Sequence, residues 1–276
     1  MKLYQMSDAV RYSRMNTTEL RATFLVEDLF HPGAIDVVYV DLDRTVIGSA
    51  VPLGQLLVLG TYPELRATYF TERRELAVLN IGGPGSMTVD GTLFEMAPLS
   101  CLYIGRGNEQ IAFASVNADQ PAEFYFLSYP AHAVHPTTLL KQHEADTSDL
   151  GAPETCNVRR IHRYVHLAGV PSCQLVMGFT AVATGSNWNT MPPHTHMRRS
   201  EIYLYFNLSD ADRVIHLMGP ADETRHIVVA NKQAVVSPGW SIHAGAGTSA
   251  YSFCWGMGGE NQAFNDMDQV AVASLK

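Results

Sequence analysis

Residues 194–206 have the sequence His-Thr-His-Met-Arg-Arg-Ser-Glu-Ile-Tyr-Leu-Tyr-Phe. An earlier segment, residues 69–80, has a similar pattern of residue types: Tyr-Phe-Thr-Glu-Arg-Arg-Glu-Leu-Ala-Val-Leu-Asn. Each segment places an arginine pair and a glutamate before a short apolar run that is typical of a buried strand. Matching segments in the two halves of a chain indicate an internal duplication. We therefore predict an N-terminal half, residues 1–145, and a C-terminal half, residues 146–276.

Short runs rich in β-branched and aromatic residues fill both halves of the chain. They recur at intervals of about 8–12 residues, which is typical of an antiparallel sandwich or barrel rather than of βαβ units. Asp90-Gly91 is a strong hairpin signal between two such runs. The clearest runs are Val37–Val40, Leu76–Ile81, Phe124–Leu127, Gln174–Thr180, Ile202–Phe206, Val214–Met218 and Tyr251–Trp255. The fold class predicted is all-β.

Other segments are predicted to flank the strands. Asn16 and Glu19 have the spacing of a capping box, which predicts a short helix to about Val26. Residues 143–155 are polar and contain glycine and proline, so they are the candidate linker. Residues 265–276 are expected to form a short closing helix or a tail.

The composition excludes several classes of protein. The chain has 276 residues, of which 46% are hydrophobic and 17% charged, and its net charge is -8. A disordered chain would be less hydrophobic, and a nucleic-acid-binding protein would carry a basic excess. The charged fraction is below the roughly 25% of an average domain, which favours a homo-oligomer. With no long apolar segment, no secretory signal and four scattered cysteines, we expect a cytoplasmic protein with no membrane or nucleic-acid partner.

The strongest chemical signal is a set of three histidines and one glutamate in the C-terminal half. His194 and His196 share one face of a strand, because side chains alternate along it. Glu201 has the wrong parity for that face unless the chain turns at residues 197–200. His243 follows a turn-rich segment that can direct its imidazole inward. Three imidazoles and a carboxylate suit Zn, Mn, Fe, Ni or Co, and four ligands leave coordination positions open for substrate.

The N-terminal half has no matching set. Tyr69 and Phe70 stand where the other half has histidines, and Glu75 has no imidazole partners nearby in sequence. We expect Glu75 to be structural and the chain to hold one metal ion, in the C-terminal half.

The pattern from His194 to Glu201, followed by Pro238 and His243, matches the two cupin motifs, although Trp240 stands where glycine is frequent. Over nearly its whole length the chain also resembles the 5-keto-4-deoxyuronate isomerases, or 4-deoxy-L-threo-5-hexosulose-uronate ketol-isomerases, of pectin and glycosaminoglycan breakdown. Met197 and Ser200 depart from the family's pattern. The segments that carry the resemblance are 24–27, 72–76, 80–83, 188–196, 223–227, 237–243, 255–257 and 259–262.

The resemblance implies a duplicated cupin, in which each half is a double-stranded β-helix (jelly-roll barrel) with short flanking helices. It implies a zinc ion held by His194, His196, Glu201 and His243, and a hexamer. The implied reaction is a metal-dependent aldose–ketose isomerisation in uronate catabolism. It converts 5-dehydro-4-deoxy-D-glucuronate, also named 4-deoxy-L-threo-5-hexosulose uronate, to 3-deoxy-D-glycero-2,5-hexodiulosonate.

This reaction needs a base to move a proton between C2 and C1, and a cation to hold the distant carboxylate. Glu201 is a candidate ligand and base, and His226 a candidate proton carrier. A hydride shift would need no base. Candidates for the carboxylate are Arg198, Arg199 and Arg225, for which an ion pair at a surface or interface is the alternative.

Two tryptophans and three further histidines complete the set of residues considered. Trp188 and Trp240 could form walls of the pocket, with buried aromatic packing as the alternative. His162, His166 and His216 are expected to be structural. Two other functions stay open: a non-catalytic sugar-acid-binding bicupin, and an iron-dependent cupin dioxygenase with the same ligand types.

Overall fold

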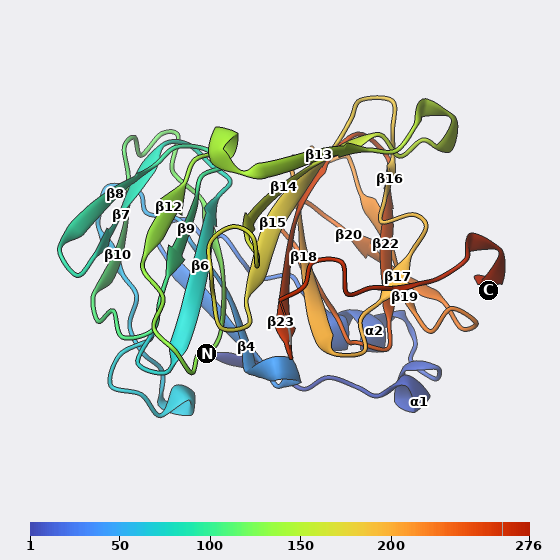
Figure 1. Ribbon diagram of the computed structural model, residues 1–276, viewed down its shortest axis with the longest axis horizontal. Coiled ribbons are helices and arrows are strands. Elements are labelled where there is room, and N and C mark those ends of the chain that lie inside the picture. The colour runs from blue at the N-terminus through green and yellow to red at the C-terminus, as the bar shows by residue number, and fades with distance from the viewer. Residues whose placement is uncertain (261) are drawn as a thin grey trace. The chain divides into compact units, whose positions relative to one another are not determined.

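The computed structural model describes residues 1–260 and 262–276 (Figure 1). Asn261, which belongs to the last segment of the resemblance, lies outside the described residues. The chain forms two compact units. The predicted division after residue 145 lies beside the boundary at Asp146, but the units also exchange two segments. Unit 1 contains Met1–Tyr4, Asp28–Asp146 and Tyr164–Val176, and unit 2 contains Gln5–Glu27, Thr147–Arg163 and Met177–Lys276.

Unit 1 contains two sheets whose apolar faces form one core. Phe113 of the smaller sheet stacks on Phe126 of the larger sheet, with ring centroids 6.1 Å apart. The larger sheet has the order β1 (Lys2–Tyr4), β3 (Ile35–Val40), β4 (Thr45–Ala50), β11 (Phe124–Pro130), β6 (Arg74–Asn80), β9 (Cys101–Ile104) and β12 (Thr138–Leu140). The smaller sheet has the order β5 (Leu57–Val58), β10 (Ile111–Ser115), β7 (Gly85–Val89) and β8 (Thr92–Met96). Short 3-10 turns lie at Leu42–Arg44, Pro63–Leu65 and Gln142–Glu144.

The hairpin predicted at Asp90-Gly91 joins β7 to β8. Asp90 has φ 46° and Gly91 has φ 81°, so both turn residues are in the left-handed region. A two-residue turn of this kind matches the twist of the two strands, and it favours Asp-Gly because glycine adopts positive φ without steric cost.

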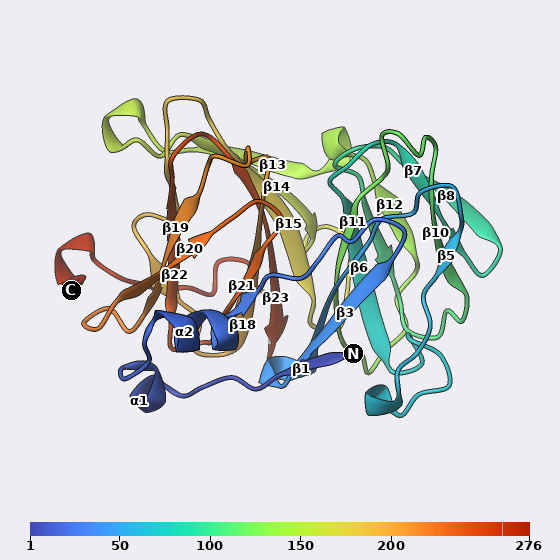
Figure 2. The ribbon, with the colours of Figure 1, turned by 180° about the vertical axis from the view of Figure 1, so that it is seen from behind.

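Unit 2 contains most of a second pair of sheets and the chain's α-helices within the described residues (Figure 2). The larger sheet has the order β13 (Asp146–Leu150), β14 (Arg159–Val165), β15 (Val176–Val182), β23 (Ser252–Gly259), β18 (Arg199–Phe206), β21 (Ala234–Ser237) and β2 (Leu25–Val26). The smaller sheet has the order β16 (Trp188–Asn189), β22 (Ile242–Gly247), β19 (Val214–Gly219) and β20 (Arg225–Val229). Two short strands, β17 (His194–Thr195) and β24 (Asp268–Gln269), pair with each other, and 3-10 turns lie at Pro153–Thr155 and Val272–Ser274. The predicted all-β class is confirmed.

The predicted capping box is present at the start of α2 (Thr17–Phe24). The Asn16 side chain accepts a hydrogen bond from the Glu19 N–H at 3.0 Å, and the Glu19 carboxylate accepts one from the Asn16 N–H at 2.9 Å. The helix ends at Phe24 rather than at Val26, because Leu25 and Val26 pair with β21 as a strand. A shorter helix, α1 (Ala9–Tyr12), was not predicted.

Residues 143–155 are not simply a linker, because β13 within them joins the sheet beside β14. The segment after residue 265 contains β24 and a 3-10 turn. In the described parts of the chain, no helix combines the length and the apolar character needed to cross a membrane.

Candidate metal centre

The three histidines and the glutamate come from both sheets of unit 2 and from the segment between them. His194 lies on β17, His196 directly follows it, and the chain then turns at Met197–Arg198. Glu201 lies on β18 of the larger sheet, and His243 lies on β22 of the smaller one. The turn removes the parity problem that the sequence posed, because Glu201 lies on a different strand from the first two histidines.

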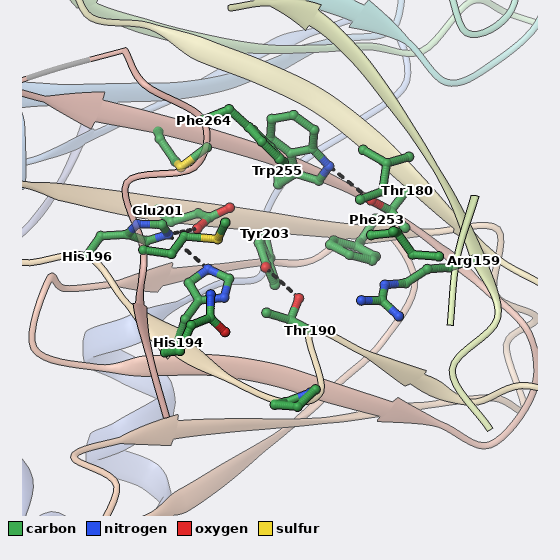
Figure 3. A pocket seen from close by; sticks show the side chains of 16 residues that line it. Arg159, Thr180, Thr190, His194, His196, Glu201, Tyr203, Phe253, Trp255 and Phe264 are labelled. Carbon is green, nitrogen blue, oxygen red and sulfur yellow. Dashed lines mark hydrogen bonds and ion pairs between the residues drawn. The ribbon is translucent and has the colours of Figure 1, made fainter. Parts of the chain in front are cut away.

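The four side chains converge on one point, and their ligand atoms all lie within 4.8 Å of one another (Figure 3). The Nε2 atom of His194 lies 3.0 Å from Nε2 of His196 and 3.0 Å from Nε2 of His243. The Oε2 atom of Glu201 lies 3.0 Å from Nε2 of His196 and 2.8 Å from Nε2 of His243. Among the described residues, this is the one group of three or more His, Cys, Asp or Glu side chains with such spacing.

The surroundings of the histidines favour a cation at this point. Burial, together with the neighbouring His243, lowers the pKa of His194 from 6.5 to about 2, so its imidazole is neutral. The Nδ1 atom of His196 lies 2.8 Å from the backbone oxygen of Asp266, an acceptor, so Nδ1 carries the proton and Nε2 presents a lone pair. Imidazole nitrogens that face each other at 3.0 Å cannot all be satisfied by mutual hydrogen bonds, whereas a metal ion satisfies them together.

The carboxylate of Glu201 supplies the charge that a divalent cation requires. Glu201 is 4% exposed. Burial by itself would raise the pKa of its carboxyl group, but His243 and His196 outweigh burial and hold the pKa well below its ordinary value. A buried carboxylate without a cation is costly, so this residue also fits a metal site. With metal–ligand bonds of roughly 2.1 Å, neighbouring ligands of an octahedral ion lie about 3.0 Å apart, close to the spacing observed.

A cavity of about 240 Å³ opens beside these residues. Aromatic and apolar side chains form much of its wall, and its polar groups include Tyr203 and Thr190, whose hydroxyls lie 2.8 Å apart. Burial raises the pKa of Tyr203 well above its ordinary value, so the phenol is neutral. The cavity's volume is below the roughly 300–1,000 Å³ of drug-sized sites, so the cavity suits a molecule smaller than a typical drug. Other described lining residues include Arg159, Thr180, Phe253, Trp255, Phe264 and Gln269 (Figure 3).

Part of the cavity wall comes from the C-terminal segment, which the sequence showed only as a helix or tail. Its strand β24 pairs with β17, placing Thr195 opposite Asp268. Arg199, which is 3% exposed, donates hydrogen bonds to the backbone oxygens of Ala263, Phe264 and Asp266. Arg198 forms an ion pair with Asp266 on the exposed side. Arg198 and Arg199 therefore fix the C-terminal segment against the site, and neither is among the lining residues.

The structure places two sequence-predicted catalytic residues outside the cavity. Arg225 and His226 lie on β20, and neither is among the described residues that line it. Arg225 donates to the Ser13 backbone oxygen and to Glu223, and it lies over the Tyr12 ring. His226 is exposed. The packing of the α1 region against β20 thus holds Arg225 away from this cavity, and the roles that the sequence gave to Arg225 and His226 stay predictions.

The two tryptophans considered as pocket walls, Trp188 and Trp240, are not among the described lining residues. Trp240 packs on Tyr12 and Phe24, with ring centroids 5.2 Å and 6.3 Å away. Trp255 is the tryptophan that lines the cavity among the described residues, and its indole N–H donates a hydrogen bond to the Thr180 hydroxyl.

The remaining histidines and Glu75 lie in structural surroundings. His162 stacks on Phe179 at 4.4 Å, His166 lies 3.9 Å from Asp146, and His216 lies 2.7 Å from the Tyr205 hydroxyl. Glu75 of unit 1 is fully buried. Its carboxylate accepts hydrogen bonds from the backbone N–H groups of Cys173, Gln174 and Leu175 and from the Tyr103 hydroxyl. Backbone donors thus surround this carboxylate, where Glu201 has imidazoles.

Comparison with known proteins gives consistent results. The model of the KduI/IolB family matches residues 55–274. The chain is 53% identical over 265 residues to the 4-deoxy-L-threo-5-hexosulose-uronate ketol-isomerase of Kineococcus radiotolerans, covering 95% of each protein. It is 48% identical over 277 residues to the enzyme of the same name from Opitutus terrae, covering 100% of each.

Two solved structures share the fold at low sequence identity. An IolB-like protein from Salmonella typhimurium has a TM-score of 0.71 at 15% identity, covering 90% of this chain and 97% of that one. Oxalate decarboxylase from Lactobacillus farciminis has a TM-score of 0.60 at 9% identity, covering 87% of each chain. These likenesses confirm the predicted all-β cupin fold.

Proposed function

Because the chain belongs to the KduI/IolB family, we propose that it is a ketol-isomerase that converts 4-deoxy-L-threo-5-hexosulose uronate to 3-deoxy-D-glycero-2,5-hexodiulosonate. The observation that carries the proposal is identity of 53% over nearly the full length to a relative with that activity in its name. The converging His194, His196, Glu201 and His243 beside a cavity supply the chemistry that such a reaction needs.

We propose that these four side chains hold one divalent metal ion in unit 2 and that unit 1 holds none. A bound divalent cation supplies Lewis acidity, which polarises the substrate's C1 carbonyl and C2 hydroxyl oxygens. The neutral imidazole of His194 presents a lone pair to it, and Glu201 offsets part of its charge. Zinc is the ion proposed, because three imidazoles and one carboxylate suit it well; manganese, iron, cobalt and nickel accept the same donors.

The residues of the cavity bind and orient the substrate. Phe253, Trp255 and Phe264 exclude water from the reacting carbons. The Tyr203–Thr190 hydroxyl pair can exchange hydrogen bonds with substrate hydroxyls. Among the described lining residues, Glu201 is the one carboxylate, so proton transfer between C2 and C1 is assigned to it. A hydride shift, the alternative route, would leave Glu201 as a ligand alone.

The oligomeric state and the cellular compartment are proposed from the surface and the cysteines. Exposed apolar residues of unit 1, such as Val58, Leu93 and Val116, support a homo-oligomer, proposed to be a hexamer. The four cysteines form no disulfide bond in the described structure, which supports a reducing compartment such as the cytoplasm. Light scattering measures the number of subunits in the assembly directly. The physiological source of the substrate is proposed to be uronate from pectin or glycosaminoglycan breakdown.

The test of the proposed function is NMR spectroscopy of the product formed from the unsaturated uronate that a pectate lyase pathway releases. We expect the C1 aldehyde signal to be replaced by that of a C2 ketone, with no uptake of oxygen. Binding without turnover would identify a sugar-acid-binding bicupin instead, and oxygen consumption would identify a dioxygenase. In deuterium oxide, label at C1 of the product supports transfer of a proton that exchanges with solvent, and its absence supports a hydride shift.

A further inference from the structure

Arg159 extends into the cavity from β14. Apart from the clustered histidines, it is the one basic side chain among the described lining residues. Figure 3 shows it across the cavity from His194 and Glu201, with Tyr203 between them. The cavity therefore has a cluster suited to a metal ion at one end and a guanidinium group at the other.

This guanidinium group has no acidic partner in the described structure. Its hydrogen bond goes from Nη1 to the backbone oxygen of Asn157, at 2.8 Å. Burial lowers its pKa, and no neighbouring carboxylate opposes that effect. The adjacent Arg160, by contrast, donates to both carboxylate oxygens of Asp149, at 2.7 Å and 2.8 Å. A partly desolvated cation without a counter-ion is unfavourable unless an anion joins it, so Arg159 is available to an anionic ligand.

The arginines first expected to hold the substrate carboxylate are engaged elsewhere. Arg198 pairs with Asp266, Arg199 donates to backbone oxygens, and Arg225 pairs with Glu223. None of them is among the described residues that line the cavity. The position of Arg159 on the cavity wall therefore distinguishes it from all three.

We propose that Arg159 binds the terminal carboxylate of the substrate, while the oxygens at C1 and C2 face the His194–Glu201 end. This inference rests on the proposed isomerase function and adds the residue that determines specificity. The planar guanidinium can form two parallel hydrogen bonds with a carboxylate, which fixes both the end and the direction of the chain. A linear sugar without that carboxylate lacks this contact and is a poor substrate.

The test compares two variants on two substrates. In Arg159→Met we expect kcat/KM for the sugar acid to fall about 100-fold, mainly through KM, because a charge-assisted contact far from the reacting carbons is lost. The second substrate is the methyl ester of the same sugar acid. The unaltered protein should prefer the acid about 100-fold over the ester, and Arg159→Met should treat the two alike. Arg159→Lys, which retains the charge but not the fork, should be intermediate.

Arg160→Met is the matched control, because Arg160 is the exposed neighbour on the same strand. It should leave both substrates' kinetics unchanged, and metal content should be the same in every variant. Equal turnover of acid and ester by the unaltered protein would overturn the proposal, and this result needs no variant to fold. An unchanged KM in Arg159→Met would also overturn it. If the unaltered protein does not isomerise the acid at all, the proposed function itself fails.

Discussion

The Oε2 atom of Glu201 lies 2.8 Å from Nε2 of His243, although β18 and β22, which carry them, belong to different sheets of unit 2. The proposed metal centre therefore joins both sheets across the interior of the unit. Each sheet has its own ladder of backbone hydrogen bonds, β18 with β23 and β22 with β19. We infer that the fold holds the ligands in place and does not depend on them to form.

Replacing one imidazole should remove the metal and leave the fold intact. In His243→Ala we expect the affinity for the metal to fall more than about 100-fold, since loss of even an outer partner of a ligand costs 10–100-fold. His196→Ala should behave in the same way, and isomerisation should be lost in both. Elemental analysis, circular dichroism and light scattering check metal content, folding and assembly.

The matched control is His226→Ala, which removes an exposed histidine of the same unit. It should retain full metal content and turnover. A large loss of activity in that variant would show that His226 has the catalytic role that the sequence suggested. Unchanged turnover in His243→Ala would refute the assignment of the ligands.

Arg199 should affect the metal centre through the C-terminal segment. It holds the backbone oxygen of Asp266, which also accepts from Nδ1 of His196. In Arg199→Met we expect metal affinity to fall about 10- to 100-fold, because His196 loses the partner that fixes its tautomer. Competition with a chelator measures this affinity.

Arg198→Met provides the comparison, since it breaks an exposed ion pair with the same residue, Asp266. Exposed ion pairs contribute about 0–1 kcal/mol, so metal affinity should change little. Equal effects in the two variants would contradict a specific role for the buried arginine.

Glu75 should affect stability and not metal content. In Glu75→Gln, an amide N–H₂ replaces one acceptor oxygen and meets N–H and O–H donors. We expect a loss of about 2–4 kcal/mol in the free energy of unfolding. Tyr103→Phe removes a single hydrogen bond to the carboxylate and should cost about 1.5–3 kcal/mol. Urea unfolding measures both, and a drop in bound metal in Glu75→Gln would place a metal role in unit 1.

His216 should make the folded state sensitive to acid. It is fully buried, it lies 2.7 Å from the Tyr205 hydroxyl, and burial lowers its pKa from 6.5 to about 3, with a smaller effect of His243 in the same direction and of Glu201 in the opposite one. Between these values the unfolded chain takes up a proton that the folded chain does not. The contribution of His216 to the free energy of unfolding is therefore fully present above about pH 6.5. It falls by about 1.4 kcal/mol per pH unit toward pH 3.

His216→Gln should reduce this slope by about one proton, because glutamine does not titrate and can still bond to Tyr205. Urea unfolding of the metal-free proteins across this pH range makes the comparison without the effect of metal release. Identical slopes for the unaltered protein and His216→Gln would show that His216 takes up a proton as readily in the folded state as in the unfolded state.

The sequence was sufficient for the features that rest on local patterns. Asp90-Gly91 specified its hairpin, and Asn16 with Glu19 specified the start of a helix, because both signals act within a few residues. His194 and His196 were recognisable because metal ligands are few in type and strand geometry restricts their spacing.

Residues placed by long-range packing could not be predicted in this way. Arg159 and Arg160 look alike in sequence, yet alternation along β14 directs one to the cavity and the other to Asp149. Asp266 acts through its backbone oxygen, which any residue has, so its side chain gave no signal. Arg225 appeared suited to the substrate because the docking of Tyr12 beside it is invisible in the linear sequence.

The most direct test of the account is to measure metal content and isomerisation together during removal and return of the metal. The purified protein is stripped with a chelator, its metal is quantified by elemental analysis, and turnover of the sugar acid is followed by NMR spectroscopy as zinc is added back. We expect activity to be lost with the metal and to rise in proportion to zinc until one ion is bound per chain. Full turnover by protein that contains no metal would contradict the account.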